Sequence, residues 1–64
     1  MKKAILTESL TFWPDRISPY SLTMQEGESV FIILNEGERV LVSISEEPTA
    51  GDSRWVSRDM VSLR

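Results

Sequence analysis

The stretch LTMQEGESVFIILNEGERVLVSI, residues 22–44, decides the fold of this chain. It contains two runs rich in β-branched and aromatic residues, 29–34 and 39–44, and each is too short for a helix of ordinary length. The four residues between them, Asn35-Glu36-Gly37-Glu38, include Asn and Gly, which accept the positive φ angle of a tight reversal. The stretch therefore predicts two antiparallel strands joined by a hairpin turn, and Val40, Val42 and Ile44 share one face of the second strand.

Shorter β-like runs flank this hairpin on both sides. Upstream, Glu26-Gly27-Glu28 is a turn signal that follows a short strand. Downstream, a polar loop at 46–53 precedes another strand, and Arg58-Asp59-Met60 is too brief for an α-helix but suits one 3₁₀ turn. The expected strands are 4–6, 22–24, 29–34, 39–44, 54–57 and 61–63.

The segment 8–21 is less regular than the rest of the chain. It carries Pro14 and Pro19 and no sustained hydrophobic period, which favours an ordered excursion or an edge ribbon over a central strand. The 64 residues make one domain, 1–64, that hides roughly 60% of its unfolded surface. An all-β chain of this size must close on itself or leave edges that invite aggregation. We therefore expect an all-β fold, a small barrel of five or six strands with one short 3₁₀ turn.

The composition excludes several kinds of chemistry. The chain has no Cys and no His, so disulfides, thiolates, imidazole bases and the usual zinc ligand sets are absent. Ten acidic against seven basic residues give a net charge of −3, the wrong sign for a protein that neutralises phosphates. Glu46, Glu47 and Asp52 lack the alternating frame of a hard-metal site, and we expect them to be solvated. We therefore expect no enzyme activity, no metal or cofactor and no direct contact with nucleic acid.

The N-terminus begins like a secretory signal, but Thr7 and Glu8 interrupt its apolar run far too early for export. The longest apolar run, Val30 to Leu34, is too short to span a bilayer. We expect a soluble, cytoplasmic, standalone protein without membrane contact.

Two segments resemble the Src-homology-3 (SH3) family. The family pattern Leu-Ser-Phe-x-x-Gly-Asp-x-Leu-x-Val-Leu, which crosses a diverging turn, is similar to residues 22–33 here, LTMQEGESVFII. The family's closing Gly-Tyr-Ile-Pro-Ser-Asn-Tyr-Val is similar to residues 54–61, RWVSRDMV. The resemblance covers about two thirds of the chain and implies an SH3-like small barrel. The bacterial SH3-like modules are an equally good comparison.

The chain departs from the peptide-binding members of that family at the ligand-facing positions. The family's binding tryptophan falls at Arg39, its binding proline at Ser57 and the following tyrosine at Met60. The early Ala-Leu-Tyr-Asp-Tyr signature is also missing. A groove for proline-rich peptides needs rings spaced to grip prolines, so we do not expect this chain to bind such peptides.

Aromatic and acidic residues are the candidate partner contacts. Successive side chains of an extended segment alternate, so Phe12 and Trp13 are not both directed inward unless the segment folds back to cap the barrel. Either Trp55 packs across the core from Ile32 and Val42, or Val56 takes the core position and the Trp55 ring is partly exposed. The full candidate set is Phe12, Trp13, Asp15, Tyr20, Glu36, Glu38 and Trp55.

These features predict a non-catalytic protein-protein interaction module that binds and modulates a larger enzyme or assembly. Aromatic anchors would bury apolar area, and the acids Asp15, Glu36 and Glu38 would favour a basic protein partner. One alternative is an acidic mimic of nucleic acid that inhibits a nucleic-acid-binding protein. Another is a homo-oligomer that associates through an exposed edge of the barrel and shares a site between chains.

Overall fold

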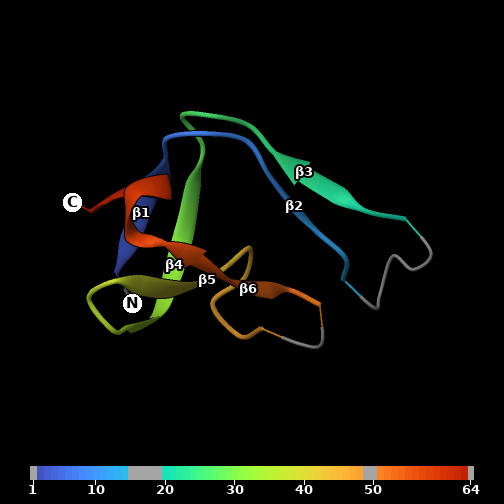
Figure 1. Ribbon diagram of the computed structural model, residues 1–64. Helices are drawn as coiled ribbons and strands as arrows, with labels where there is room; N and C mark the ends of the chain where they lie inside the picture. Colours follow the sequence, from blue (N-terminus) through green and yellow to red (C-terminus); the bar gives the residue numbers. More distant parts are fainter. Residues whose placement is uncertain (1, 15–19, 49–50, 64) are drawn as a thin grey trace.

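The computed structural model describes residues 2–14, 20–48 and 51–63, and the fold they form is all-β, as predicted (Figure 1). The N-terminal half holds β1 (Lys3–Leu6), β2 (Leu10–Phe12), β3 (Leu22–Met24) and β4 (Ser29–Asn35). The C-terminal half holds β5 (Arg39–Ser43), β6 (Ser53–Ser57), the 3₁₀ turn η2 (Arg58–Met60) and β7 (Val61–Leu63). In the described part of the chain no helix is long and apolar enough to cross a membrane.

The hairpin predicted from the opening stretch is present. β4 pairs antiparallel with β5, and Asn35 lies opposite Val40 at the end of the ladder. Gly37 has a φ of +88°, which explains the glycine in this turn, and its backbone N–H donates to Asn35 Oδ1 at 2.9 Å. The short gap between the two hydrophobic runs is therefore a turn between neighbouring strands.

The strands form two sheets. A five-stranded antiparallel sheet has the order β6-β5-β4-β1-β7, and β2 and β3 form a separate two-stranded ribbon. β4 is the central strand, because its first half pairs with β1 and its second half with β5. Among the described strands, no ladder joins the edge strands β6 and β7, so hydrogen bonding does not close this sheet into a barrel.

The strand β2 lies inside the segment that the sequence left irregular. Leu10 and Phe12 are buried while Thr11 is half-exposed, the alternation of a strand with one face on the core. Thr11 Oγ1 lies 3.0 Å from Thr23 Oγ1 across the ribbon. β2 was hard to recognise in the sequence, because only three residues are extended before Pro14. The expectation of an edge ribbon therefore describes this segment better than the set of expected strands, which did not include it.

The core lies between the inner face of the large sheet and the β2–β3 ribbon. Val40 and Val42, which were predicted to share one face, are both buried, and Ile44 packs against the cluster without being fully enclosed. The buried apolar residues are Ala4, Leu6, Leu10, Phe12, Val30, Ile32, Val40, Val42, Val56 and Val61. Each described strand except β3 supplies at least one of them, so the core is assembled from segments spread along most of the described chain.

Backbone contacts hold the start and the end of the chain together. Thr7 N donates to Met60 O at 2.9 Å, and the Thr7 hydroxyl donates to Asp59 O at the same distance. Gly27 N donates to Leu6 O at 2.9 Å. The end of β1 is thus fixed both to η2 and to the turn before β4.

A close backbone approach joins the β5–β6 connection to the residues after β2. Gly51 has a φ of +81°, and a Cβ built there would lie 1.8 Å from the carbonyl oxygen of Trp13. Gly37 also has positive φ, but a Cβ at Gly37 would meet no atom within 4 Å. Of these two positions, Gly51 alone requires glycine for packing as well as for backbone conformation.

We predict that Gly51→Ala destabilises the protein more than Gly37→Ala. The Gly37 variant carries only the positive-φ cost of about 1–2 kcal/mol. The Gly51 variant adds displacement of the Trp13 backbone, for a total of more than about 3 kcal/mol. Urea unfolding followed by tryptophan fluorescence measures both, and equal losses in the two variants would contradict the close approach.

Candidate interaction surface

The adjacent rings Phe12 and Trp13 separate to opposite sides of the chain. Phe12 is 0% exposed and belongs to the core, whereas Trp13 is 58% exposed. The prediction that Phe12 contacts a partner is therefore wrong, because the alternation along β2 turns Leu10 and Phe12 inward, and Trp13 follows directly after the strand. The expectation that one of the two rings is exposed is confirmed for Trp13.

The exposed Trp13 ring is held by an arginine from the large sheet. The Arg54 guanidinium carbon lies 5.7 Å from the centroid of the Trp13 ring, within the range of a cation–π contact. Arg54 Nη1 also donates to Thr11 O at 2.8 Å. One side chain of β6 therefore links the sheet to β2 and restrains the ring beside it. Sequence reasoning missed Arg54, because no local pattern reports a contact between residues 43 positions apart.

Trp55 lies on the outer face of β6, and its neighbour Val56 lies in the core. Trp55 is 37% exposed and Val56 is buried, so the alternation placed the valine inside and the interpretation of Trp55 as a core residue is wrong. The Arg39 guanidinium carbon stands 4.1 Å from the centroid of the Trp55 ring. The ring is partly covered by this arginine and partly open.

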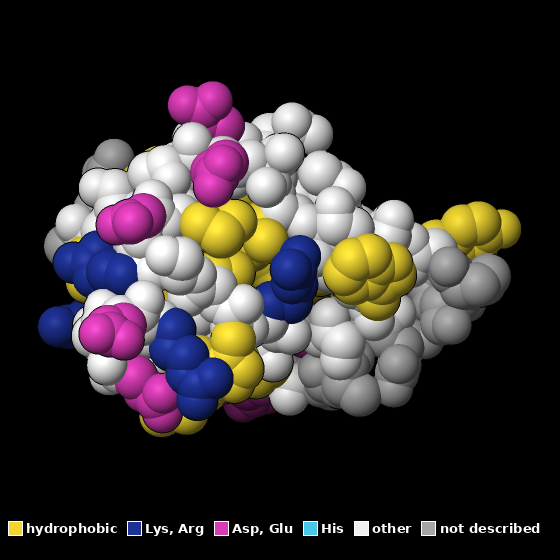
Figure 2. Space-filling view, in the orientation of Figure 1, with side chains coloured by type: hydrophobic (Ala, Val, Ile, Leu, Met, Phe, Trp, Pro, Cys, Tyr) yellow, Lys and Arg dark blue, Asp and Glu magenta, His cyan; other side chains and the backbone are white. Residues whose placement is uncertain are grey.

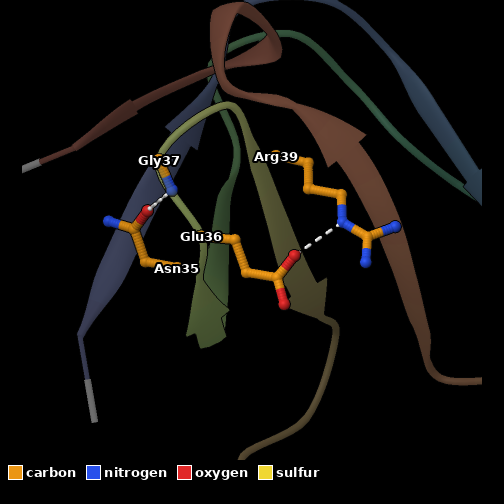
Figure 3. A network of polar contacts seen from close by, with 4 residues as sticks. All are labelled: Asn35, Glu36, Gly37 and Arg39. Carbon is orange, nitrogen blue, oxygen red and sulfur yellow. Dashed lines mark hydrogen bonds and ion pairs between the residues drawn. The ribbon is translucent and has the colours of Figure 1, made fainter.

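The three acids predicted to favour a basic partner, Asp15, Glu36 and Glu38, form the predicted acidic rim, and the two that the structure describes differ in their environments. Glu36 Oε1 accepts a hydrogen bond from Arg39 Nε at 2.7 Å, so this carboxylate already has a cationic partner on its own chain (Figure 3). Glu38 is exposed, and its backbone carbonyl accepts from Arg58 N at 3.0 Å. Asp15 lies outside the described residues, and Tyr20, at the start of the second described range, is strongly exposed.

An apolar row on the outer face of the large sheet was not predicted. Leu34 on β4 lies opposite Leu41 on β5, which lies opposite Trp55 on β6. Leu34 is 52% exposed and Leu41 is half-buried. Leu34 reaches this face because the β4–β5 register shifts between Ile32 and Leu34, and a bulge of this kind changes which face a side chain occupies. In the space-filling view, hydrophobic patches are interspersed with Lys and Arg side chains (Figure 2).

Asp52 departs from its predicted environment. It was expected to be solvated, but it is 0% exposed. Its backbone carbonyl accepts a hydrogen bond from Ile44 N at 3.1 Å, which extends the β5–β6 ladder beyond the strand ends. Asp52 is enclosed because it follows Gly51, where the connection meets the Trp13 backbone. This carboxylate is therefore part of the interior and not of the acidic rim.

The described residues contain no group of three or more acidic side chains placed to hold a metal ion, and they enclose no pocket. Comparison with protein families, with curated proteins and with solved structures gives no match for this chain. The surface must therefore be interpreted from its own residues.

We predict energetic coupling between Arg54 and Trp13. Arg54→Met removes the donor to Thr11 O and should lower the free energy of unfolding by about 1–2 kcal/mol. In a double-mutant cycle with Trp13→Ala, we expect a coupling energy of about 0.5–1 kcal/mol from the cation–π contact. Arg58→Met, which removes an arginine from the adjacent turn, is the matched control and should stay within about 0.5 kcal/mol of wild type. Additive effects of Arg54→Met and Trp13→Ala would show that the ring is not held by the arginine.

Proposed function

We propose that this chain is a non-catalytic protein-interaction module that binds and modulates a larger protein or assembly. The observation that supports this proposal best is the state of Trp13, a large ring that is mostly exposed and yet restrained by Arg54 and by the neighbouring backbone. Tryptophan and arginine are enriched among residues that dominate binding energy in protein interfaces. Trp13 is the principal anchor in this proposal, and Tyr20 is an additional contact.

Restraint of the ring matters for affinity. Ordering a mobile side chain on binding costs about 0.5–1.5 kcal/mol, and a ring that is already held avoids part of that cost. Arg54 approaches Trp13 from a strand of the main sheet and not from a loop, so the anchor is supported by the most regular part of the fold. A partner would present an apolar pocket to Trp13, with hydrogen-bond acceptors at its rim for the guanidinium group.

We further propose that the fold is an SH3-like barrel without the proline-peptide groove. The turn at Gly27 lies between β3 and β4, where the resemblance places the diverging turn, and η2 lies directly before the last strand. The positions that would hold a proline-rich ligand carry Arg39, Ser57 and Met60. The binding surface in this proposal is therefore the Trp13 side of the molecule.

Charge has a secondary role in the proposed interaction. The net charge of −3 and the exposed Glu38 would increase the rate of encounter with a basic partner. Glu36 contributes less than the sequence suggested, because Arg39 neutralises it locally. We expect the module to act in the cytoplasm, where a chain without cysteine needs no oxidising conditions.

The acidic-mimic alternative has less support. A protein that imitates nucleic acid needs a continuous array of negative charge, but arginines lie beside both tryptophans. The two hypotheses differ in salt dependence, because screening weakens a charge-based complex far more than one based on buried rings.

We predict that Trp13→Ala weakens partner binding by at least about tenfold, the equivalent of 1.4 kcal/mol, while the domain stays folded. The partner is first captured from native lysate and purified, and its affinity for each variant is then measured by titration calorimetry. Trp13→Phe, which keeps a ring, should retain more affinity than Trp13→Ala. Trp55→Ala removes the second exposed tryptophan, on the face of β6 opposite to Arg54, and should lose less affinity than Trp13→Ala, because Trp13 is the principal anchor. Thermal unfolding verifies that each variant is folded.

Two results would contradict the proposal. One is full affinity in Trp13→Ala. The other is an affinity that falls steeply between low and high salt, which would favour the acidic mimic.

A further inference from the structure

The outer edge of β6 carries backbone groups that face away from the sheet. Ile44 N donates to Asp52 O at one end of the β5–β6 ladder, and Arg58 N donates to Glu38 O at the other end. Hydrogen-bonded and non-hydrogen-bonded pairs alternate along an antiparallel ladder. Arg54 and Val56 therefore direct their N–H and C=O groups toward β5, and Ser53, Trp55 and Ser57 direct theirs outward.

β6 has few of the features that keep another strand from pairing with a sheet edge. Edge strands are usually protected by proline, charged side chains such as lysine, a bulge or very short length. β6 has five residues in an uninterrupted register with β5 and contains no proline or lysine, and its one charged side chain, Arg54, is bonded to Thr11 O. The opposite edge strand, β7, has only three residues. β6 is therefore the more suitable of the two edges for strand addition.

The apolar row Leu34–Leu41–Trp55 ends at this same edge. If a second β6 paired antiparallel with the first about a two-fold axis at Trp55, the outward N–H and C=O of both Trp55 residues would bond each other. Ser53 of each copy would then pair with Ser57 of the other. In this register the two apolar rows join into one strip across both sheets, with the two indole rings adjacent on the same face. The edge and the side chains on it thus fit the same symmetric partner.

We propose that β6 is a self-association edge, and that its occupant is a second copy of this chain, paired β6 to β6 in the register centred on Trp55. Beside the apolar row, Glu36 and Arg39 form an ion pair within each copy, so this pair adds no net charge to the face that the two copies share. On the inner face, Arg54 lies opposite Val56 of the second copy, and its guanidinium group is bonded to Thr11 O.

This proposal is independent of the Trp13 surface. Arg54, which contacts Trp13, and Trp55 are consecutive residues of a strand, so their side chains point to opposite faces of the sheet. The register centred on Trp55 uses outward backbone groups and the outer face of β6, and makes no use of the Trp13 ring. Loss of partner binding in Trp13→Ala and loss of self-association in a β6 variant are therefore separate results.

The test uses the backbone of Ser57. Its φ of −63° already suits proline, and its N–H faces outward, so Ser57→Pro removes an edge donor without removing a bond to β5. The Ser57 hydroxyl accepts a bond of 3.4 Å from Asp59 N, and Ser57→Ala loses this same bond while keeping the edge donor. Ser57→Ala is therefore the matched control.

Sedimentation equilibrium over a concentration series measures self-association of wild type and both variants. We expect wild type and Ser57→Ala to approach the mass of a dimer, and Ser57→Pro to associate at least about tenfold more weakly. Hydrogen exchange of the wild-type chain gives a readout that needs no variant. The Trp55 amide should be protected at high concentration and exchange rapidly at low concentration.

Each contrary result overturns the proposal. A wild-type chain that stays monomeric into the millimolar range has no self-association edge. If Ser57→Pro dimerises like Ser57→Ala, or if the Trp55 amide exchanges equally fast at both concentrations, then any dimer uses another surface.

Discussion

The register of β4 is the constraint on which the rest of the structure depends. This strand pairs with β1 through its first residues and with β5 through its last, so both halves of the large sheet take their alignment from it. Because side chains alternate with a period of two, a slip of one residue would exchange Val30 and Ile32 with Phe31 and turn the core side of the strand outward. The bulge after Ile32 applies such a slip locally. It brings Leu34 to the outer face, opposite Leu41, and so creates the apolar row.

The parts of the fold that followed from sequence are those with a local cause. Asn35 and Gly37 form a turn whose chemistry can be recognised in four residues, and the alternation of Trp55 with Val56 is decided by which side chain suits a core. The parts that did not follow depend on tertiary contacts. β2 exists because Leu10 and Phe12 find a core to enter, and Asp52 is buried because Gly51 lies against the Trp13 backbone.

The candidate surface likewise combines residues that sequence could identify with contacts that depend on the tertiary structure. Trp13, Tyr20, Glu38 and Trp55 were identified by residue type, and each is exposed. Residue type could not reveal which side chains lie beside them. Arg54 beside Trp13, Arg39 beside Trp55 and the ion pair of Glu36 make this a surface of aromatic and guanidinium groups more than an acidic rim. These neighbours change the chemistry that a partner must provide, because a guanidinium group seeks hydrogen-bond acceptors where a carboxylate seeks donors.

The long-range bonds of this small fold have a consequence for how it forms. Arg54 reaches Thr11 across 43 positions of the chain, and Thr7 reaches Asp59 across 52. Contacts with such large sequence separation require closure of long loops, which slows folding compared with helical domains of equal size. The Trp13 ring acquires the support of Arg54 only when β6 lies beside β2. A chain emerging from the ribosome therefore has no supported Trp13 ring until Arg54 has left the exit tunnel.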